Sequence, residues 1–394
     1  MGPENMQSNM YEEIANRLTA YDFQLTIGLL PDPDPILKKL PDAGYPLLTG
    51  LLSDPHLMSL ITQRKMKTLK NEYRWTPGDD TESAKNILEQ FESDLSKMGK
   101  KKIYDLFTQI LDAPFFGYVP IELIWAADSG FIRLKDIRPL PQHWFGFAAK
   151  DNTPRFLSRN HPWEGELLPD NKFVIASHQP TFENPYGIRL LSRCYWAIEF
   201  KRGGIKLWLA FLERFGVPSL IGKYPRGFTK TERNELVEKL LQLSQRSVGI
   251  VPEGGAVEIL DTKSASSSDI FEKLRSAMNK ETSAVILGQA SALDIGDQST
   301  YASSKVVGES IDDLIESDKL LLKSTMNDIA AMYTRINSHE TSPPTLSFYE
   351  DSDPKSDHAK RDEVLTRTGV QFTEKYYEKT YGLKLDEFKL SRNN

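Results

Sequence analysis

The sequence predicts an α+β fold, in which blocks of helices and blocks of short strands follow one another along the chain. Three observations support this. Apolar residues recur at helical spacing over most of 53–112. The stretch 115–157 is rich in short aromatic and β-branched runs, which are typical of strands. From 305 to 337 the helical spacing continues without interruption, which predicts a helix of about 33 residues, or about 50 Å.

Composition excludes several classes of protein. With 394 residues, 39% of them hydrophobic, the chain can bury a sizeable core, and its length predicts two or three domains. A net charge of −6 excludes a protein that coats nucleic acid through a strongly basic surface. The single cysteine, Cys194, excludes an internal disulfide. The start of the chain has no secretory signal pattern and no apolar run approaches 18 residues, so we expect neither secretion by that route nor a membrane span.

Residues 1–48 are predicted to form an N-terminal arm or linker. The run Pro31–Pro35 alternates proline with aspartate, which removes amide donors and fixes the backbone. Its carboxylates could bind a cation, but a solvated, extended linker is the favoured interpretation. A helix is expected to start at Ser53, whose hydroxyl can cap the first turn ahead of Pro55. Two more helices are expected, over about 82–98 and 102–112.

An antiparallel β region is predicted next. Glu122 lies at an alternating position of the first strand, either as a buried carboxylate with a raised pKa or, more ordinarily, facing solvent. The expected strands are Tyr118–Trp125, Phe131–Leu134, Trp144–Phe147, Phe156–Ser158 and Lys172–Ala176.

A long helix is expected over 185–215, weakened by the Gly203-Gly204 pair, which favours a bend or break. A β-α-β-β unit follows. Its helix opens with a capping box formed by Thr229 and Glu232. The expected elements are a strand at 217–221, a helix at about 230–244, and a hairpin of 247–251 with 256–260.

The C-terminal third is predicted to contain a helix at about 269–287 and a polar, Gly- and Ser-containing loop at 288–304. A loop of this length is uncommon in a compact domain unless it is functional or disordered. The long helix 305–337 follows it. A strand at 345–349 and helices near 356–367 and 373–381 complete the expected elements.

No catalytic motif is present: the sequence lacks a Walker phosphate loop, a dinucleotide fingerprint, a nucleophile elbow and a zinc-protease motif. The six histidines are scattered, which favours solvated or hydrogen-bonded rings over a metal site. Cys194 stands beside Tyr195 and Trp196 in the expected helix, where a packed side chain is favoured over a nucleophile. We therefore expect no enzyme activity and no cofactor.

Charge is unevenly distributed along the chain. Segment 201–246 holds ten basic side chains against four acidic ones, inside a chain of net charge −6. Such a basic module suits an acidic partner or DNA phosphate, although a solvated surface is an equally good interpretation. The long amphipathic helix has an acidic outer face and needs a partner surface, which repeated subunits in a ring would provide.

The order of these segments resembles the portal proteins of tailed bacteriophages, and specifically the Mu-like portal family. The resemblance covers about 45–385. It rests on the following runs taken together: Ser53-Asp54-Pro55-His56-Leu57 through Arg64-Lys65 and Trp75, Gly117 to Trp125, Asn184-Pro185-Tyr186-Gly187, Phe215-Gly216-Val217-Pro218, Gly288-Gln289, Thr368-Gly369-Val370 and Tyr381-Gly382-Leu383.

The resemblance implies a ring, usually of twelve subunits, that conducts double-stranded DNA during packaging and ejection. Its implied partners are the terminase large subunit, the major capsid or scaffold protein and a head-completion or adaptor protein, with no membrane. It implies a location at the portal vertex of the capsid, and in the host cytoplasm during assembly. ATP hydrolysis would belong to another chain. The implied regions are an arm (1–48), the α/β wing (49–184), a stem helix (185–216), the clip (217–262), a second stem helix (263–287), the tunnel loop (288–304), the tunnel helix (305–337) and a C-terminal wing or small crown (338–394).

The resemblance also implies two sets of site residues. Those expected to approach the channel are Gln289, Asp297, Gln298, Thr300, Tyr301 and Lys305. Those expected to dock partners through the stem and clip are Lys201, Arg202, Lys206, Lys223, Arg226, Lys230 and Arg233. Two alternatives stay open. Another structural protein of the head-tail junction would differ in ring size, whereas a metal-dependent nuclease or hydrolase would cleave DNA in a way that carboxylate substitution abolishes.

Overall fold

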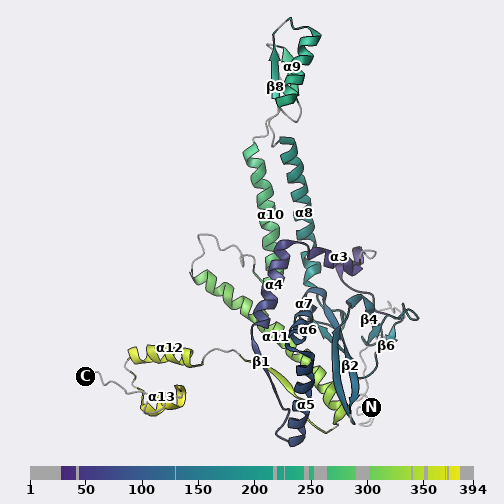
Figure 1. The fold of residues 1–394 in the computed structure, drawn as a ribbon, viewed down its shortest axis with the longest axis vertical. Coiled ribbons are helices and arrows are strands. Elements are labelled where there is room, and N and C mark those ends of the chain that lie inside the picture. Colours follow the sequence, from purple (N-terminus) through teal and green to yellow (C-terminus); the bar gives the residue numbers. More distant parts are fainter. Residues whose placement is uncertain are drawn as a thin grey trace, which may run out of the picture.

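The structure is a computed structural model that describes residues 28–40, 44–128, 130–215, 220–225, 227–243, 248–252, 264–289, 301–338, 340–349, 354–368, 370 and 372–381. A body of helices and small sheets carries a two-helix stalk, and a small α/β unit lies at the far end of the stalk (Figure 1). The expected α+β class is confirmed. No helix in the described ranges has the length and apolarity that a membrane span requires.

The body is built on a three-stranded antiparallel sheet. Its central strand β2 (Tyr118–Asp128) pairs with β3 (Phe131–Pro139) on one side and β7 (Phe173–Ser177) on the other. The first half of β2 is buried because helices cover it, whereas its end is exposed. Glu122 is not a deeply buried carboxylate. Its side chain is partly exposed, and its carboxylate lies 3.2 Å from the ammonium of Lys172.

Four of the helices that precede this sheet lie between residues 55 and 116. They are α4 (Pro55–Leu69), α5 (Glu82–Met98), α6 (Lys100–Ile110) and the short α7 (Ala113–Phe116). The expected 82–98 helix is confirmed. The expected cap of the first helix is wrong: the Asp54 carboxylate accepts from Leu57 N, while the Ser53 hydroxyl donates to Gly50 O. Because Asp54 directly precedes Pro55 at the first helical position, the cap falls one residue later than expected.

The sequence patterns did not predict β1 (Glu72–Thr76), which pairs antiparallel with β10 (Thr345–Tyr349). β10 itself occupies the expected residues. Trp75 of β1 packs edge-on against Phe91 at a centroid distance of 4.9 Å, so this ribbon closes one side of the main core. Its two strands lie far apart in sequence, and no local pattern links them.

A second small sheet, with order β4–β5–β6, lies beside the first (Figure 1). It comprises β4 (Phe145–Phe147), β5 (Pro154–Phe156) and β6 (Glu166–Leu167), and a single 3-10 turn (Gln142–Trp144) leads into it. The strand expected at Phe156–Ser158 is present but lies two residues earlier in the chain. The one expected at Lys172–Ala176 is β7.

The described part of the N-terminal segment is not a solvated linker, so this expectation is wrong for residues 28–40. Asp34 is buried and caps the short helix α2 (Pro35–Lys39), which α3 (Gly44–Leu51) follows. The guanidinium of Arg189 donates to both carboxylate oxygens of Asp32, at 2.8 and 2.7 Å. Asp32 of this run is therefore paired with an arginine of the same chain.

The stalk consists of α8 (Leu190–Phe215) and α10 (Ser264–Leu287), which run antiparallel side by side (Figure 1). The expected break at Gly203-Gly204 is wrong, because α8 is continuous. A Cβ on Gly204 would come within 2.7 Å of Leu274, so glycine there lets α10 approach closely. Gly204 therefore serves helix packing, whereas Gly203 faces open space.

The tip unit, defined as β8 (Leu220–Tyr224), α9 (Lys230–Leu243) and β9 (Val248–Pro252), joins the two stalk helices. β8 and β9 pair in parallel, with α9 as the crossover, and the expected capping box is confirmed: Glu232 accepts from Thr229 N, and Thr229 Oγ1 accepts from Glu232 N. The second hairpin strand, expected at 256–260, lies outside the described residues.

The long helix α11 (Tyr301–Asn337) crosses the body obliquely below the stalk (Figure 1). It starts four residues before the expected 305, so 301–304 are helical and do not belong to the loop. Two further helices follow β10, namely α12 (Pro354–Arg367) and α13 (Glu374–Tyr381), close to the expected positions.

Candidate functional site

The candidate functional site is the stalk together with the place where it joins the body. Aromatic rings hold the upper part of the stalk together: Trp208 of α8 stacks on Phe271 of α10 at 6.4 Å with an angle of 10° between the planes, and Phe211 packs on the same ring at 6.1 Å. The two helices therefore contact each other through a defined seam. The sides of α8 that flank this seam remain exposed.

Buried charges hold the root of the stalk on α4. Lys201 of α8 is only 6% exposed, and its ammonium lies 2.5 Å from the carboxylate of Asp54, at the start of α4. The same ammonium donates to the side-chain oxygen of Asn279 on α10. His56 reaches α10 as well, with its Nε2 3.1 Å from Asn279 O and 3.0 Å from Ser283 Oγ. One end of α4 thus contacts both stalk helices.

One arginine joins α10 and α11, the helices on either side of residues 290–300. Arg64 of α4 donates from Nη1 to the carbonyl of Ile286, in the last turn of α10, at 2.8 Å. Its Nε and Nη2 donate to the Asp318 carboxylate of α11, at 2.7 and 2.9 Å. Both charged side chains are about 96% buried or more. Arg64 therefore fixes α10 and α11 relative to each other.

The sequence carries a signal for this ion pair in the spacing of its buried positions. In α4 the buried positions include Leu57, Leu60, Ile61 and Arg64, so the arginine lies on the apolar stripe. Asp318 likewise continues the buried series of Ile311 and Ile315 in α11. A charge on an apolar stripe must find a partner when it is buried, and an arginine and an aspartate in this position are natural counterparts.

The predicted channel residues are placed only in part. Gln289 directly follows the Gly288 turn at the end of α10, and Tyr301 and Lys305 belong to the first turns of α11. Asp297, Gln298 and Thr300 lie outside the described residues. Because α11 starts at Tyr301, the last four residues of the expected loop 288–304 are helical.

The predicted docking residues fall into two groups. Lys201 and Arg202 belong to the stalk root, where Lys201 is buried and Arg202 donates to Gly50 O and Ser53 Oγ. Lys206 is exposed on the stalk, and Lys223 and Lys230 are exposed on the tip unit. Arg233 lies over the Tyr224 ring at 5.7 Å, and Arg226 lies outside the described residues. The structure thus separates internal ion pairs from an exposed basic tip.

Burial shifts the pKa values of two side chains near the stalk root. Burial raises the pKa of the Cys194 thiol to about 12, so the thiol stays protonated. Burial lowers the pKa of His178, because desolvation disfavours its charged form. Among the described residues no group of three His, Cys, Asp or Glu side chains is placed to hold a metal ion.

Comparisons with known proteins support the resemblance. The chain is 26% identical over 310 residues to the portal protein of Escherichia phage Mu, covering 73% of this chain and 56% of that protein. It is 24% identical over 206 residues to the Mu-like prophage FluMu protein gp29 of Haemophilus influenzae, covering 51% of this chain and 39% of the relative. The chain thus spans about half the length, or less, of these two relatives.

Solved structures show a shared fold. A chain from the neck of an empty gene transfer agent particle superposes with a TM-score of 0.63 at 14% identity, covering 94% of this chain and all of that one. A chain from the virion of the native gene transfer agent particle gives 0.57 at 12% identity, covering 86% and 93%. The family described as the portal protein of Mu bacteriophage matches residues 45–383, and this chain belongs to that family.

Proposed function

We propose that this chain is one subunit of a ring-shaped portal, a structural and non-catalytic channel for double-stranded DNA at the capsid vertex. In this proposal the body residues 49–184 form the wing. The stalk helices form the stem, the tip unit forms the clip, and the segment after α10 is the tunnel loop carried by α11. Residues 338–394 form the C-terminal wing or a small crown. Family membership and the shared fold support this assignment.

The observation that carries the proposal is a pair of exposed apolar flanks on α8. At ~100° per residue, Trp196, Phe200 and Leu207 lie on one flank of the helix, about a half-turn away from the other flank. Their exposed fractions are 47%, 57% and 65%. The opposite flank carries Ile205, Leu209 and Leu212, which are 38%, 56% and 43% exposed. The seam with α10 lies between the two flanks.

Two unlike apolar flanks on one stalk favour a head-to-tail contact between copies. The first flank of one stalk would cover the second flank of its neighbour, and such heterologous contacts generate rings when the rotation closes. A pair of exposed apolar stripes of this size is uncommon on a monomeric protein. The exposed lysines of the tip unit, Lys223 and Lys230, remain available to acidic partners, which we propose are the terminase large subunit and a head-completion or adaptor protein.

The net negative charge also suits a channel. Tight neutralisation of many phosphates would hold DNA in place, whereas a channel with few basic residues lets it slide. The residues proposed to approach DNA are Gln289, Asp297, Gln298, Thr300, Tyr301 and Lys305. The capsid or scaffold protein would contact the wing, and the subunit would pass from the host cytoplasm to the virion as the particle assembles.

Mixing two variants tests the ring and its polarity. Phe200→Asp places a charge on the first flank and Leu209→Asp on the second, with Glu213→Gln, on the outward side of α8, as the matched control. Native mass spectrometry of the full chain should show rings for the wild type and the control, and monomers for each flank variant. A mixture of the two flank variants should give dimers only, because each retains one intact flank. Rings formed by either variant alone, or no ring from the wild type, would contradict the proposal.

A further inference from the structure

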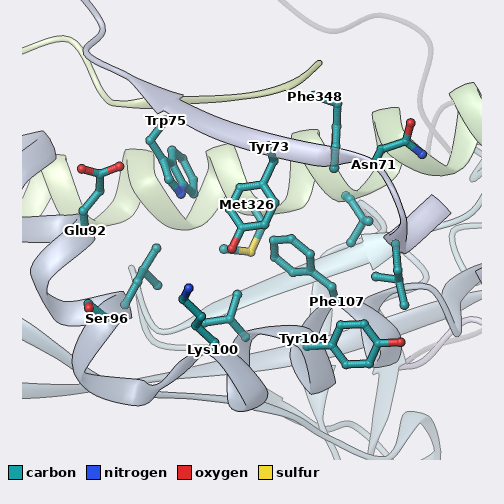
Figure 2. Close-up of a pocket in the computed structure, with 14 residues that line it drawn as sticks. Asn71, Tyr73, Trp75, Glu92, Ser96, Lys100, Tyr104, Phe107, Met326 and Phe348 are labelled. Carbon is teal, nitrogen blue, oxygen red and sulfur yellow. The ribbon is translucent and has the colours of Figure 1, made fainter. Parts of the chain in front are cut away.

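A cavity of about 480 Å³ opens on the body, away from the stalk. β1 and β10 form one wall, α5 and α6 another, and the C-terminal half of α11 the floor (Figure 2). Tyr73 and Trp75 point into it from alternating positions of β1, Phe348 points into it from the neighbouring β10, and Phe107 lies across from them on α6. The volume lies in the range of roughly 300–1,000 Å³ that is typical of ligand sites.

The apolar surface continues beyond the mouth of this cavity. Tyr73 and Tyr104 are 39% and 42% exposed, and the neighbouring Met66 is 53% exposed. The Tyr104 hydroxyl contacts the sulfur of Met66 at 3.3 Å, so these side chains form one continuous rim. A small molecule seated in the cavity would leave this rim in water. A protein segment that places one large side chain in the cavity and lies across the rim would cover both.

The cavity lining carries one basic side chain, Lys100, and one acidic side chain, Glu92. Lys100 extends from the start of α6 into the cavity, and within the described ranges it forms no ion pair (Figure 2). The first turn of α6 adds Lys101 and Lys102 and contains no acidic residue, so the positive end of the helix dipole reinforces these lysines. Lys102 pairs with Asp136, whereas Lys101 is exposed. The part of the cavity beside Lys100 therefore favours a negative group.

The same lining carries Glu92, on α5, which lies on the side of the cavity away from Tyr104 and Asn71 (Figure 2). Burial and the neighbouring Glu89 raise the pKa of Glu92. A negative charge placed beside Glu92 would be repelled, so an acidic residue of the occupant fits beside Lys100 and is disfavoured beside Glu92.

We propose that this cavity docks an acidic segment of a partner protein, with one large apolar side chain seated between Trp75 and Phe107 and a carboxylate beside Lys100. The floor of the site includes Leu322 and Met326, so the occupant contacts α11 directly. The site requires only the subunit's body and does not depend on ring assembly.

A peptide selection tests the inference. The purified full chain is used as bait for a displayed library of random 12-residue peptides, and the enriched peptides are measured by fluorescence anisotropy. We expect enrichment of peptides in which Asp or Glu lies within four positions of Trp, Phe or Leu. Lys100→Glu should weaken their binding by at least about tenfold, and Glu92→Gln should leave it equal or strengthen it.

Three further measurements make the result decisive. Ser96→Trp, which fills the cavity from its exposed edge, should abolish binding, whereas the matched charge reversal Lys150→Glu, on the turn between β4 and β5, should have no effect. The proposal would be overturned if no peptide is enriched. It would also be overturned if the enriched peptides bind Lys100→Glu and Ser96→Trp as tightly as the wild type. Saturable, Lys100-dependent binding of the aromatic sulfonate dye ANS without peptide enrichment would also overturn it, because the site would then take a small amphiphilic anion.

Discussion

Arg64 and Asp318 form a two-bond ion pair across α4 and α11, although 254 positions separate them in the sequence. The third donor of the same guanidinium satisfies the Ile286 carbonyl at the end of α10. One side chain thus links the body to both helices that flank the segment proposed as the tunnel loop. Any displacement of α11 relative to α10 must stretch or break these hydrogen bonds.

Removal of one partner should be far more harmful than removal of both. Asp318→Leu leaves the guanidinium buried without its counter-charge, and we expect a loss of about 3–5 kcal/mol of stability. The double variant Asp318→Leu with Arg64→Met should recover most of this loss, except about 1–3 kcal/mol for the Ile286 carbonyl that loses its donor. Urea unfolding measures both effects, and hydrogen exchange over 283–289 should be faster in each variant. Equal losses in the single and double variants would contradict this account.

The two stalk glycines should respond differently to the same substitution. Gly203 faces open space, so Gly203→Ala should stabilise α8 by up to about 1 kcal/mol through helix propensity. In Gly204→Ala the new methyl group lies 2.7 Å from Leu274, and the displacement of that side chain offsets the gain. Thermal unfolding and hydrogen exchange of the stalk should therefore rank Gly203→Ala above Gly204→Ala. The opposite order would mean that α10 does not pack at Gly204.

The Arg189 cluster should hold the N-terminal segment on the body. Besides both oxygens of Asp32, the guanidinium contacts Phe116 O at 3.0 Å and the Tyr45 hydroxyl at 2.8 Å. Arg189→Met removes all of these hydrogen bonds, and we expect cleavage within 28–40 by a nonspecific protease to become at least about tenfold faster, which corresponds to ~1.4 kcal/mol. Lys38→Met, an exposed change in α2, is the control and should leave the rate unchanged.

Local patterns predicted those parts of this fold that depend on neighbouring residues. The amphipathic repeat of α5, the capping box of α9 and the strand β10 all have their signals within a few positions of the chain. β1 and the tether of Asp32 were missed because their partners, β10 and Arg189, are distant in sequence. Taken alone, the proline-aspartate run 31–35 predicts a linker. It packs on the body because the buried guanidinium of Arg189 binds the Asp32 carboxylate.

In the candidate site, too, the sequence predicted what depends on neighbouring residues and missed what depends on distant ones. Counting charges identified the basic segment 201–246, but it could not distinguish Lys201, which neutralises Asp54 inside the stalk root, from Lys223, which is exposed at the tip. That distinction depends on how α8 meets α4. The apolar flanks of α8 were equally hidden, because a helix with apolar residues on several sides looks like a core helix until its neighbours are known.

The thiol of Cys194 provides a pH-dependent test of the packing at the stalk root. The side chain is 1% exposed, and its pKa of about 12 in the folded chain exceeds the ordinary value of 9.0, mainly because of burial and secondarily because of the Asp54 carboxylate. The folded state therefore holds this proton more tightly than the unfolded state. Its contribution to stability is fully present below about pH 9 and is lost as the pH rises from about 9 towards 12.

Two measurements check this expectation. At pH 8 iodoacetamide should modify the native chain at least about a hundredfold more slowly than the urea-unfolded chain, because the thiolate is the reactive species and it is scarce in the folded state. Between pH 8 and 10.5 the wild type should lose more stability than Cys194→Ala, although the variant starts lower because it leaves a small cavity. Rapid native alkylation at pH 8 would place Cys194 at an accessible surface, and α8 would then have to pack on α4 differently from the arrangement that Lys201 and Asp54 define.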